Sequence, residues 1–76
     1  MEIRESKRLK QFGRNIRAAR ERKGLTQREL SDLCGVDNSK ICKIEQGKVN
    51  MTLLTLIEIA VALNISPAAL LRAGKT

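Results

Sequence analysis

Apolar residues recur along most of this chain at the three- and four-residue spacing that is typical of amphipathic helices. The first such segment predicts a helix over residues 6–23, which Ser6 could cap and which Gly24 could end in a left-handed conformation. Residues 1–5 are expected to be frayed. One stripe of this helix is expected to be buried: Leu9, Phe12, Ile16 and Ala19.

Two shorter helices are predicted next, over residues 27–34 and 38–46. Thr26 and Glu29 fit a capping box at the start of the first, in which each satisfies a backbone donor of the other. Asp37 is placed to cap the second. Both helices therefore have a well-defined beginning in the sequence.

The last third of the chain predicts helices over residues 53–63 and 67–72, and the first of these is apolar on almost every side. One stripe is expected in the core: Leu53, Leu56, Ala60 and Leu63. A second set is expected to meet a second copy of the chain: Leu54, Ile57, Val61, Leu70 and Leu71. The alternative is that the last helix covers this second stripe within one chain.

These elements predict an all-α fold, a compact five-helix bundle that occupies residues 1–76 as a single domain. Its apolar residues are almost all aliphatic, because Phe12 is the one aromatic residue. No repeat or low-complexity segment interrupts the pattern.

The formal net charge of +7 points to a polyanionic partner, with nucleic acid ahead of a membrane surface. Residues 1–24 carry nine Lys and Arg against three Asp and Glu, whereas residues 25–50 carry four of each. The basic excess is therefore concentrated in the first element. The longest apolar run, residues 59–63, is far too short to span a bilayer.

The candidate chemistry is sparse. The chain has no histidine, and Cys34 and Cys42 do not form a CxxC pair, so we expect no metal site and no cofactor. Without paired carboxylates or a phosphate-binding loop, we expect neither an enzyme nor a small-molecule site. So few cysteines favour reduced thiols and a cytoplasmic location.

Two short helices joined by a tight turn at Gly35 have the shape of a helix-turn-helix. In that motif the second helix lies in the DNA major groove, with its N-terminal residues at the base edges. Ile41 and Ile44 would then anchor this helix to the core. Polar and basic residues would face outward: Asn38, Ser39, Lys40 and Lys43.

The segment LTQRELSDLCGVDNSKICKIEQGK, residues 25–48, resembles the helix-turn-helix of the phage repressor and Cro family. The helix spacing extends this resemblance over roughly residues 12–66, which implies a lambda repressor-like DNA-binding domain. FGRNIRAARERKGLTQ and KIEQGKVN are in particular similar to the controller proteins of restriction–modification systems.

The resemblance implies a role for several residues. The base-reading positions correspond to Asn38, Ser39 and Lys43. The positions that contact phosphate or the groove wall correspond to Gln27, Lys40, Lys48 and Asn50. Arg17, on the basic side of the first helix, is a further candidate for a phosphate contact. The family's structural ion pair corresponds to Arg20 and Glu45, and Ser31 stands where alanine is usual, so its hydroxyl needs a partner.

The sequence thus favours a sequence-specific regulator of transcription that binds double-stranded DNA as a homodimer on a two-fold symmetric operator. A restriction–modification controller is the particular form that the resemblance suggests, and RNA polymerase is a candidate partner. The alternative is an antitoxin-type or other helical interaction module whose main partner is a protein.

Overall fold

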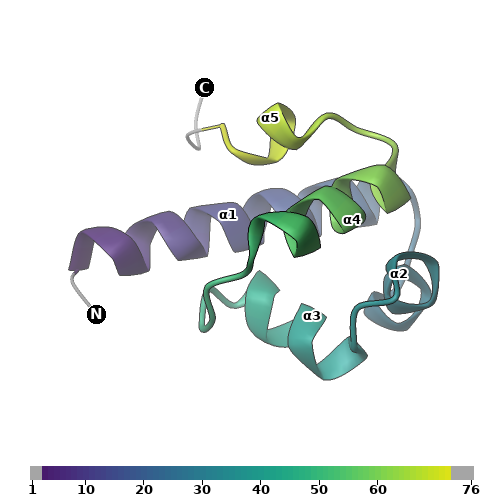
Figure 1. The fold of residues 1–76 in the computed structure, drawn as a ribbon, viewed down its shortest axis with the longest axis horizontal. Helices are drawn as coiled ribbons and strands as arrows, with labels where there is room; N and C mark the ends of the chain where they lie inside the picture. Colours follow the sequence, from purple (N-terminus) through teal and green to yellow (C-terminus); the bar gives the residue numbers. More distant parts are fainter. Residues whose placement is uncertain (1–2, 73–76) are drawn as a thin grey trace.

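Helices account for most of the computed structural model, which describes residues 3–72 (Figure 1). Within these residues there are five: α1 Ile3–Arg22, α2 Gln27–Cys34, α3 Asn38–Glu45, α4 Leu53–Leu63 and α5 Pro67–Leu70. The predicted all-α fold is confirmed, and α2 and α4 begin and end at the predicted residues. Four ends differ: α1 begins at Ile3, which makes Ser6 an interior residue, and ends at Arg22, α3 ends at Glu45, and α5 stops at Leu70. Residues 3–5 were expected to be frayed but belong to α1, and residues 1–2 lie outside the described residues.

Local side-chain hydrogen bonds explain where the helices begin. The Thr26 hydroxyl accepts from the backbone N–H of Glu29 at 3.0 Å, while the Glu29 carboxylate accepts from the N–H of Thr26 at 2.8 Å. This is the predicted capping box of α2. The Asp37 carboxylate accepts from the Ser39 N–H at 3.0 Å, and Thr52 caps α4 in the same way.

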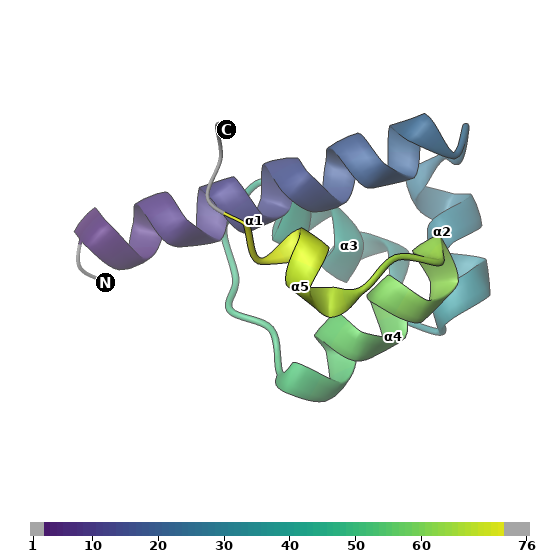
Figure 2. The same cartoon turned by 90° about the horizontal axis from the view of Figure 1, so that it is seen from above.

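The core lies where the helices meet, with α3 packed on α1 and α2, and α4 packed on α2 and α5 (Figure 2). Its largest fully buried side chains come from all five helices: Ile16, Leu30, Ile41, Ile44, Ile59, Leu63 and Leu70. Burial of this aliphatic surface is the main force that holds the short helices together, since helices of eight residues are not stable alone.

Two of the predicted buried stripes are only partly correct. On α1, Ile16 and Ala19 are buried, but Leu9 and Phe12 remain partly exposed. Both figures show the first turns of α1 extending beyond the other helices, and Phe12 lines an open groove rather than the core. Leu53 was expected in the core but is 71% exposed, although Thr55 and Leu56 in the same turn of α4 are buried.

Gly13 allows α1 and α3 to approach each other more closely than side chains normally permit. A Cβ atom on Gly13 would meet the carbonyl oxygens of Glu45 and Ile44, at 2.4 and 2.5 Å. Gly47, just after α3, has a φ of +73°, and a Cβ there would meet the backbone of Lys10 in α1. The depth at which α3 sits against α1 therefore depends on these two glycines.

Candidate nucleic-acid interface

The turn between α2 and α3 is held by one short side-chain hydrogen bond. The Ser31 hydroxyl donates to the carbonyl oxygen of Val36 at 2.6 Å, so the hydroxyl has the partner that its position requires. Gly35 ends α2 with a φ of +73°, and the following Val36 is buried. The two helices are thus joined at a fixed angle with a very short connection.

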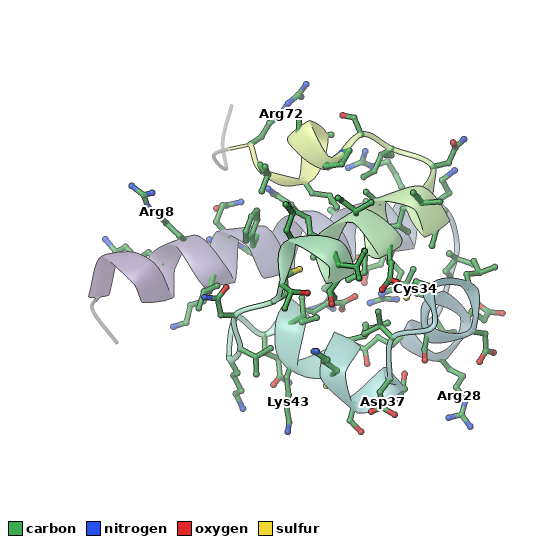
Figure 3. All side chains as sticks on the ribbon, in the orientation of Figure 1. Arg8, Arg28, Cys34, Asp37, Lys43 and Arg72 are labelled. Carbon is green, nitrogen blue, oxygen red and sulfur yellow. The ribbon has the colours of Figure 1, made fainter. Side chains whose placement is uncertain are left out.

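The outer side of α3 is polar and basic, and it faces away from the bundle. Ile41 and Ile44 are 0% and 1% exposed, so they hold the inner side of the helix in the core. Ser39, Lys40 and Lys43 are exposed. Figure 3 shows Lys43 projecting from the edge of the molecule that lies opposite α5. This exposed side has the donors and the positive charge that a DNA groove would attract.

Asn38 differs from the other expected base readers. It is the first residue of α3 and is only partly exposed. Its side-chain oxygen is buried and has no hydrogen-bond partner among the residues that the structure describes. The amide would have to rotate to present this oxygen to a base, whereas Ser39 and Lys43 already face solvent.

A buried polar network fixes α3 to both preceding helices. The Arg20 guanidinium donates two hydrogen bonds to the Glu45 carboxylate, at 2.7 and 3.0 Å, and their side chains are 10% and 3% exposed. Arg20 also donates to the carbonyl oxygen of Leu25 at 2.7 Å, and Gln27 donates to Glu45 at 3.0 Å. Glu45 therefore accepts from both α1 and α2, which holds the orientation of α3 relative to them.

This network also keeps Arg20 charged. Hydrogen bonding to Glu45 raises the pKa of the Arg20 guanidinium, and this effect outweighs burial, which by itself would lower the pKa. Gln27 was expected to contact phosphate and to brace α3. Its amide nitrogen braces α3 through Glu45, and the residue remains partly exposed at the start of α2.

The remaining candidates for phosphate contact occupy two places. Lys48 and Asn50 are exposed in the segment between α3 and α4. Arg17 is on α1, where it donates to Glu21 at 3.0 Å in an exposed i,i+4 pair. Such a pair stabilises the protein by only about 0.3–0.5 kcal/mol. It would therefore not prevent Arg17 from leaving Glu21 to contact a phosphate.

A second surface, which we call the α4 apolar face, consists of large apolar side chains that remain exposed. Its members are Leu53, Leu54, Ile57, Val61 and Leu71, which are 71%, 65%, 39%, 73% and 50% exposed. The last helix therefore does not cover these residues within one chain. Leu70 was expected on this surface but is only 1% exposed, because it points into the core while its neighbour Leu71 points outward.

Two structural residues were missed in the sequence. Gly13 carried a signal, because glycine in the interior of a helix is costly and usually marks a close approach. Asn15 donates to the carbonyl oxygens of Leu70 and Arg72, both at 2.9 Å. No local pattern could reveal a contact between residues so far apart in the chain.

Within residues 3–72, no cluster of side chains has the composition of a metal site. Over the same residues, none of the helices combines the length and apolar character needed to cross a membrane.

Together, the capped α2–α3 pair and its basic outer side define a helix-turn-helix DNA-binding protein. The family model for this motif, described as Helix-turn-helix, matches residues 16–70, which is more than half of the chain. The chain belongs to this family and is a DNA-binding transcription regulator.

Individual relatives agree with this assignment. The chain is 39% identical over 61 residues to the control protein C.SmaI of Serratia marcescens, covering 79% of this chain and 73% of that protein. It is 39% identical over 57 residues to the HTH-type transcriptional regulator y4dJ of Sinorhizobium fredii, covering 75% and 74%.

Solved structures give the same result. The restriction-modification controller protein C.AhdI of Aeromonas hydrophila matches with a TM-score of 0.80 and 39% identity, covering 82% of this chain and 94% of that one. The hypothetical transcription factor NHTF from Neisseria matches with a TM-score of 0.85 and 28% identity, covering 92% and 80%.

Proposed function

We propose that this protein is a sequence-specific regulator that binds a two-fold symmetric DNA operator as a homodimer and acts as a restriction–modification controller. The observation that carries the DNA-binding mode is the orientation of α3. Its inner side is buried, its outer side is basic, and it is held by hydrogen bonds from both preceding helices. The likeness to C.SmaI and C.AhdI supports the controller role.

In this proposal, base reading and phosphate binding belong to different residues. Ser39 and Lys43 lie on the exposed side of α3 and would reach base edges, and Asn38 would join them after its amide rotates. Basic and polar residues around α3 would contact phosphates without reading sequence: Gln27, Lys40, Lys48, Asn50 and Arg17.

The α4 apolar face supports the homodimer. Leu54, Ile57 and Val61 lie at i, i+3 and i+7 of α4 and so share one side of the helix. Covering these exposed side chains removes apolar surface from water, which stabilises a dimer. A two-fold axis over α4 would pair Leu54, Ile57 and Val61 with the same residues of the second copy, which leaves Leu71 at the edge of the contact. It would set the two α3 helices about 34 Å apart, which is one turn of DNA. RNA polymerase is a candidate partner at an adjacent promoter.

A binding selection from random duplex DNA, repeated at two salt concentrations, tests the operator. We expect a two-fold symmetric consensus with half-sites about 10 base pairs apart. Binding without an enriched sequence, which disappears as salt rises, would refute sequence-specific recognition.

Two lysine variants then separate the two kinds of contact. Lys43→Ala should change which base is preferred within each half-site, because Lys43 is exposed on α3. Lys48→Ala should weaken all sequences alike and lower the salt slope by about 1, as expected for one lost phosphate contact. Equal weakening on every sequence by Lys43→Ala would remove Lys43 from the base readers.

The dimer is tested by sedimentation of Leu54→Glu, which places a charge in the α4 apolar face, beside the matched control Leu33→Glu. Leu33 is a comparably exposed leucine, at 60%, but lies on α2. We expect only Leu54→Glu to yield monomers and to weaken operator binding. If the unmodified chain is itself monomeric at concentrations that saturate the operator, the homodimer is wrong. A different protein partner, as in the antitoxin-type alternative, would then be the occupant of this face.

A further inference from the structure

An open groove lies between the first half of α1 and the chain that follows α5, with a volume of about 490 Å³. It is lined by Arg8, Gln11, Phe12, Leu71 and Arg72. A volume of roughly 300–1,000 Å³ is usual for sites that hold a drug-sized ligand, so the groove has room for several side chains of a peptide. None of these residues takes part in the proposed DNA contacts.

The wall formed by Leu71 and Arg72 is held in place by Asn15. The Asn15 amide nitrogen donates to the carbonyl oxygens of Leu70 and Arg72, both at 2.9 Å. Its oxygen accepts from Gln11 at 3.0 Å, and Gln11 itself lines the groove. Because α5 has only four residues, these bonds and the buried side chain of Leu70 together hold its C-terminal end in place. The groove is thus organised before any partner arrives.

The groove contains apolar surface that the core does not use. Phe12 is the chain's one aromatic residue, yet it is partly exposed and is not packed against the core cluster. Leu71 is 50% exposed on the opposite wall. An apolar side chain placed between them would cover both, and aromatic residues contribute a large share of binding energy at interfaces.

The two arginines give the groove a positive rim that is not directed at the operator. Neither Arg8 nor Arg72 takes part in a salt bridge with the residues that the structure describes. Figure 3 shows both pointing to the side of the molecule opposite Lys43 and α3. A duplex bound by α3 would therefore leave them free to attract another anionic group.

We propose that this groove binds an acidic peptide segment of a partner protein that carries a large apolar side chain. Phe12 and Leu71 take the apolar side chain, and Arg8 and Arg72 pair with carboxylates on either side of it. A second duplex would satisfy the arginines but would leave the apolar walls uncovered, so the groove fits a peptide better than DNA. Since Arg8 and Arg72 lie on the side opposite Lys43, the peptide and the operator bind together.

The test uses a short fluorescein-labelled peptide of aspartate, glutamate and leucine, and a matched peptide in which alanine replaces leucine. Fluorescence anisotropy of the full chain should show saturable binding, tighter for the leucine peptide. Arg8→Glu/Arg72→Glu should weaken binding about tenfold, since each lost pair at an exposed site contributes up to roughly fivefold. The control Lys23→Glu/Arg28→Glu makes the same change in net charge at exposed residues at the other end of the molecule, and should weaken binding far less.

Two further variants test the apolar walls and the shape of the groove separately from its two arginines. Phe12→Ala should remove most of the preference for leucine over alanine, and it leaves the α4 apolar face unchanged. Asn15→Ala keeps all five lining residues but releases the wall, and should weaken the leucine peptide at least about threefold, while circular dichroism shows a folded chain.

Three results would overturn the proposal: no saturable binding, equal loss in the two double variants, or equal affinity for the two peptides. If non-operator duplex DNA displaces the peptide, and does so only when Arg8 and Arg72 are present, the groove binds phosphate groups and the proposal is wrong.

Discussion

The buried pair of Arg20 and Glu45 can be examined by removing each partner in turn. Arg20→Met keeps the length of the side chain and removes the charge. Glu45, whose side chain is 3% exposed, is then left with one donor, the Gln27 amide at 3.0 Å. Arg20→Met also leaves the carbonyl oxygen of Leu25 without its 2.7 Å hydrogen bond. This variant therefore leaves a buried carboxylate without its charged partner and a backbone carbonyl without its hydrogen-bond donor.

The magnitude follows from these contacts. Breaking a buried ion pair by removing one partner costs about 3–5 kcal/mol. Glu45→Leu should cost less, about 2–3 kcal/mol, because Arg20 keeps the Leu25 carbonyl and lies 3.9 Å from the Glu21 carboxylate. Arg20→Met/Glu45→Leu leaves no buried charge and should cost only about 1–2 kcal/mol. The coupling energy between the two sites is then at least about 3 kcal/mol.

Urea unfolding followed by circular dichroism measures all four chains. The protein concentration must be held constant, because self-association would add to the apparent stability. A domain of 76 residues has a free energy of unfolding of about 4–11 kcal/mol, so Arg20→Met removes a large share of it and is best measured in the cold. Arg20→Lys is a useful intermediate, since it keeps the charge but loses the two-pronged geometry.

The reasoning would be refuted by additive effects. If the cost of the double variant equals the sum of the two single costs, the charges do not stabilise each other across the α1–α3 contact. A loss below about 1 kcal/mol for Arg20→Met would mean that water replaces the guanidinium, so that the pair behaves like a surface pair.

The other predictions concern glycine and leucine positions. Gly13→Ala should lower the free energy of unfolding by more than about 2 kcal/mol, because its Cβ would meet backbone oxygens of α3. Gly35→Ala, with φ +73° and open space around it, should cost only about 1 kcal/mol, and similar costs in urea unfolding would contradict the close contact. Leu70→Ala should cost about 2–5 kcal/mol because the side chain is buried, whereas Leu71→Ala, at 50% exposure, should change thermal stability little in a monomer. Equal melting temperatures for these two variants would contradict the observed burial.

The helix-turn-helix itself could be predicted from the sequence because its signals are local. A cap joins residues two or three positions apart, so Thr26, Asp37 and Thr52 mark helix starts wherever the helices later pack. The i,i+3 spacing of Ile41 and Ile44 likewise identifies the inner side of α3, and thereby the outer side that carries Ser39 and Lys43. The roles of these outer residues toward DNA stay predictions.

Only the tertiary structure decided which apolar residues are buried. Leu9 and Phe12 continue the stripe of Ile16 on the same side of α1, yet they are only partly buried, because Phe12 faces an open groove and the first turns of α1 extend past the other helices. The sequence by itself determined the class of fold and where the helices begin, because hydrogen bonds between near neighbours set those features. The groove beside Asn15 and the assignment of Leu70 to the core required residues 55 positions apart to meet, and such contacts depend on how whole helices pack.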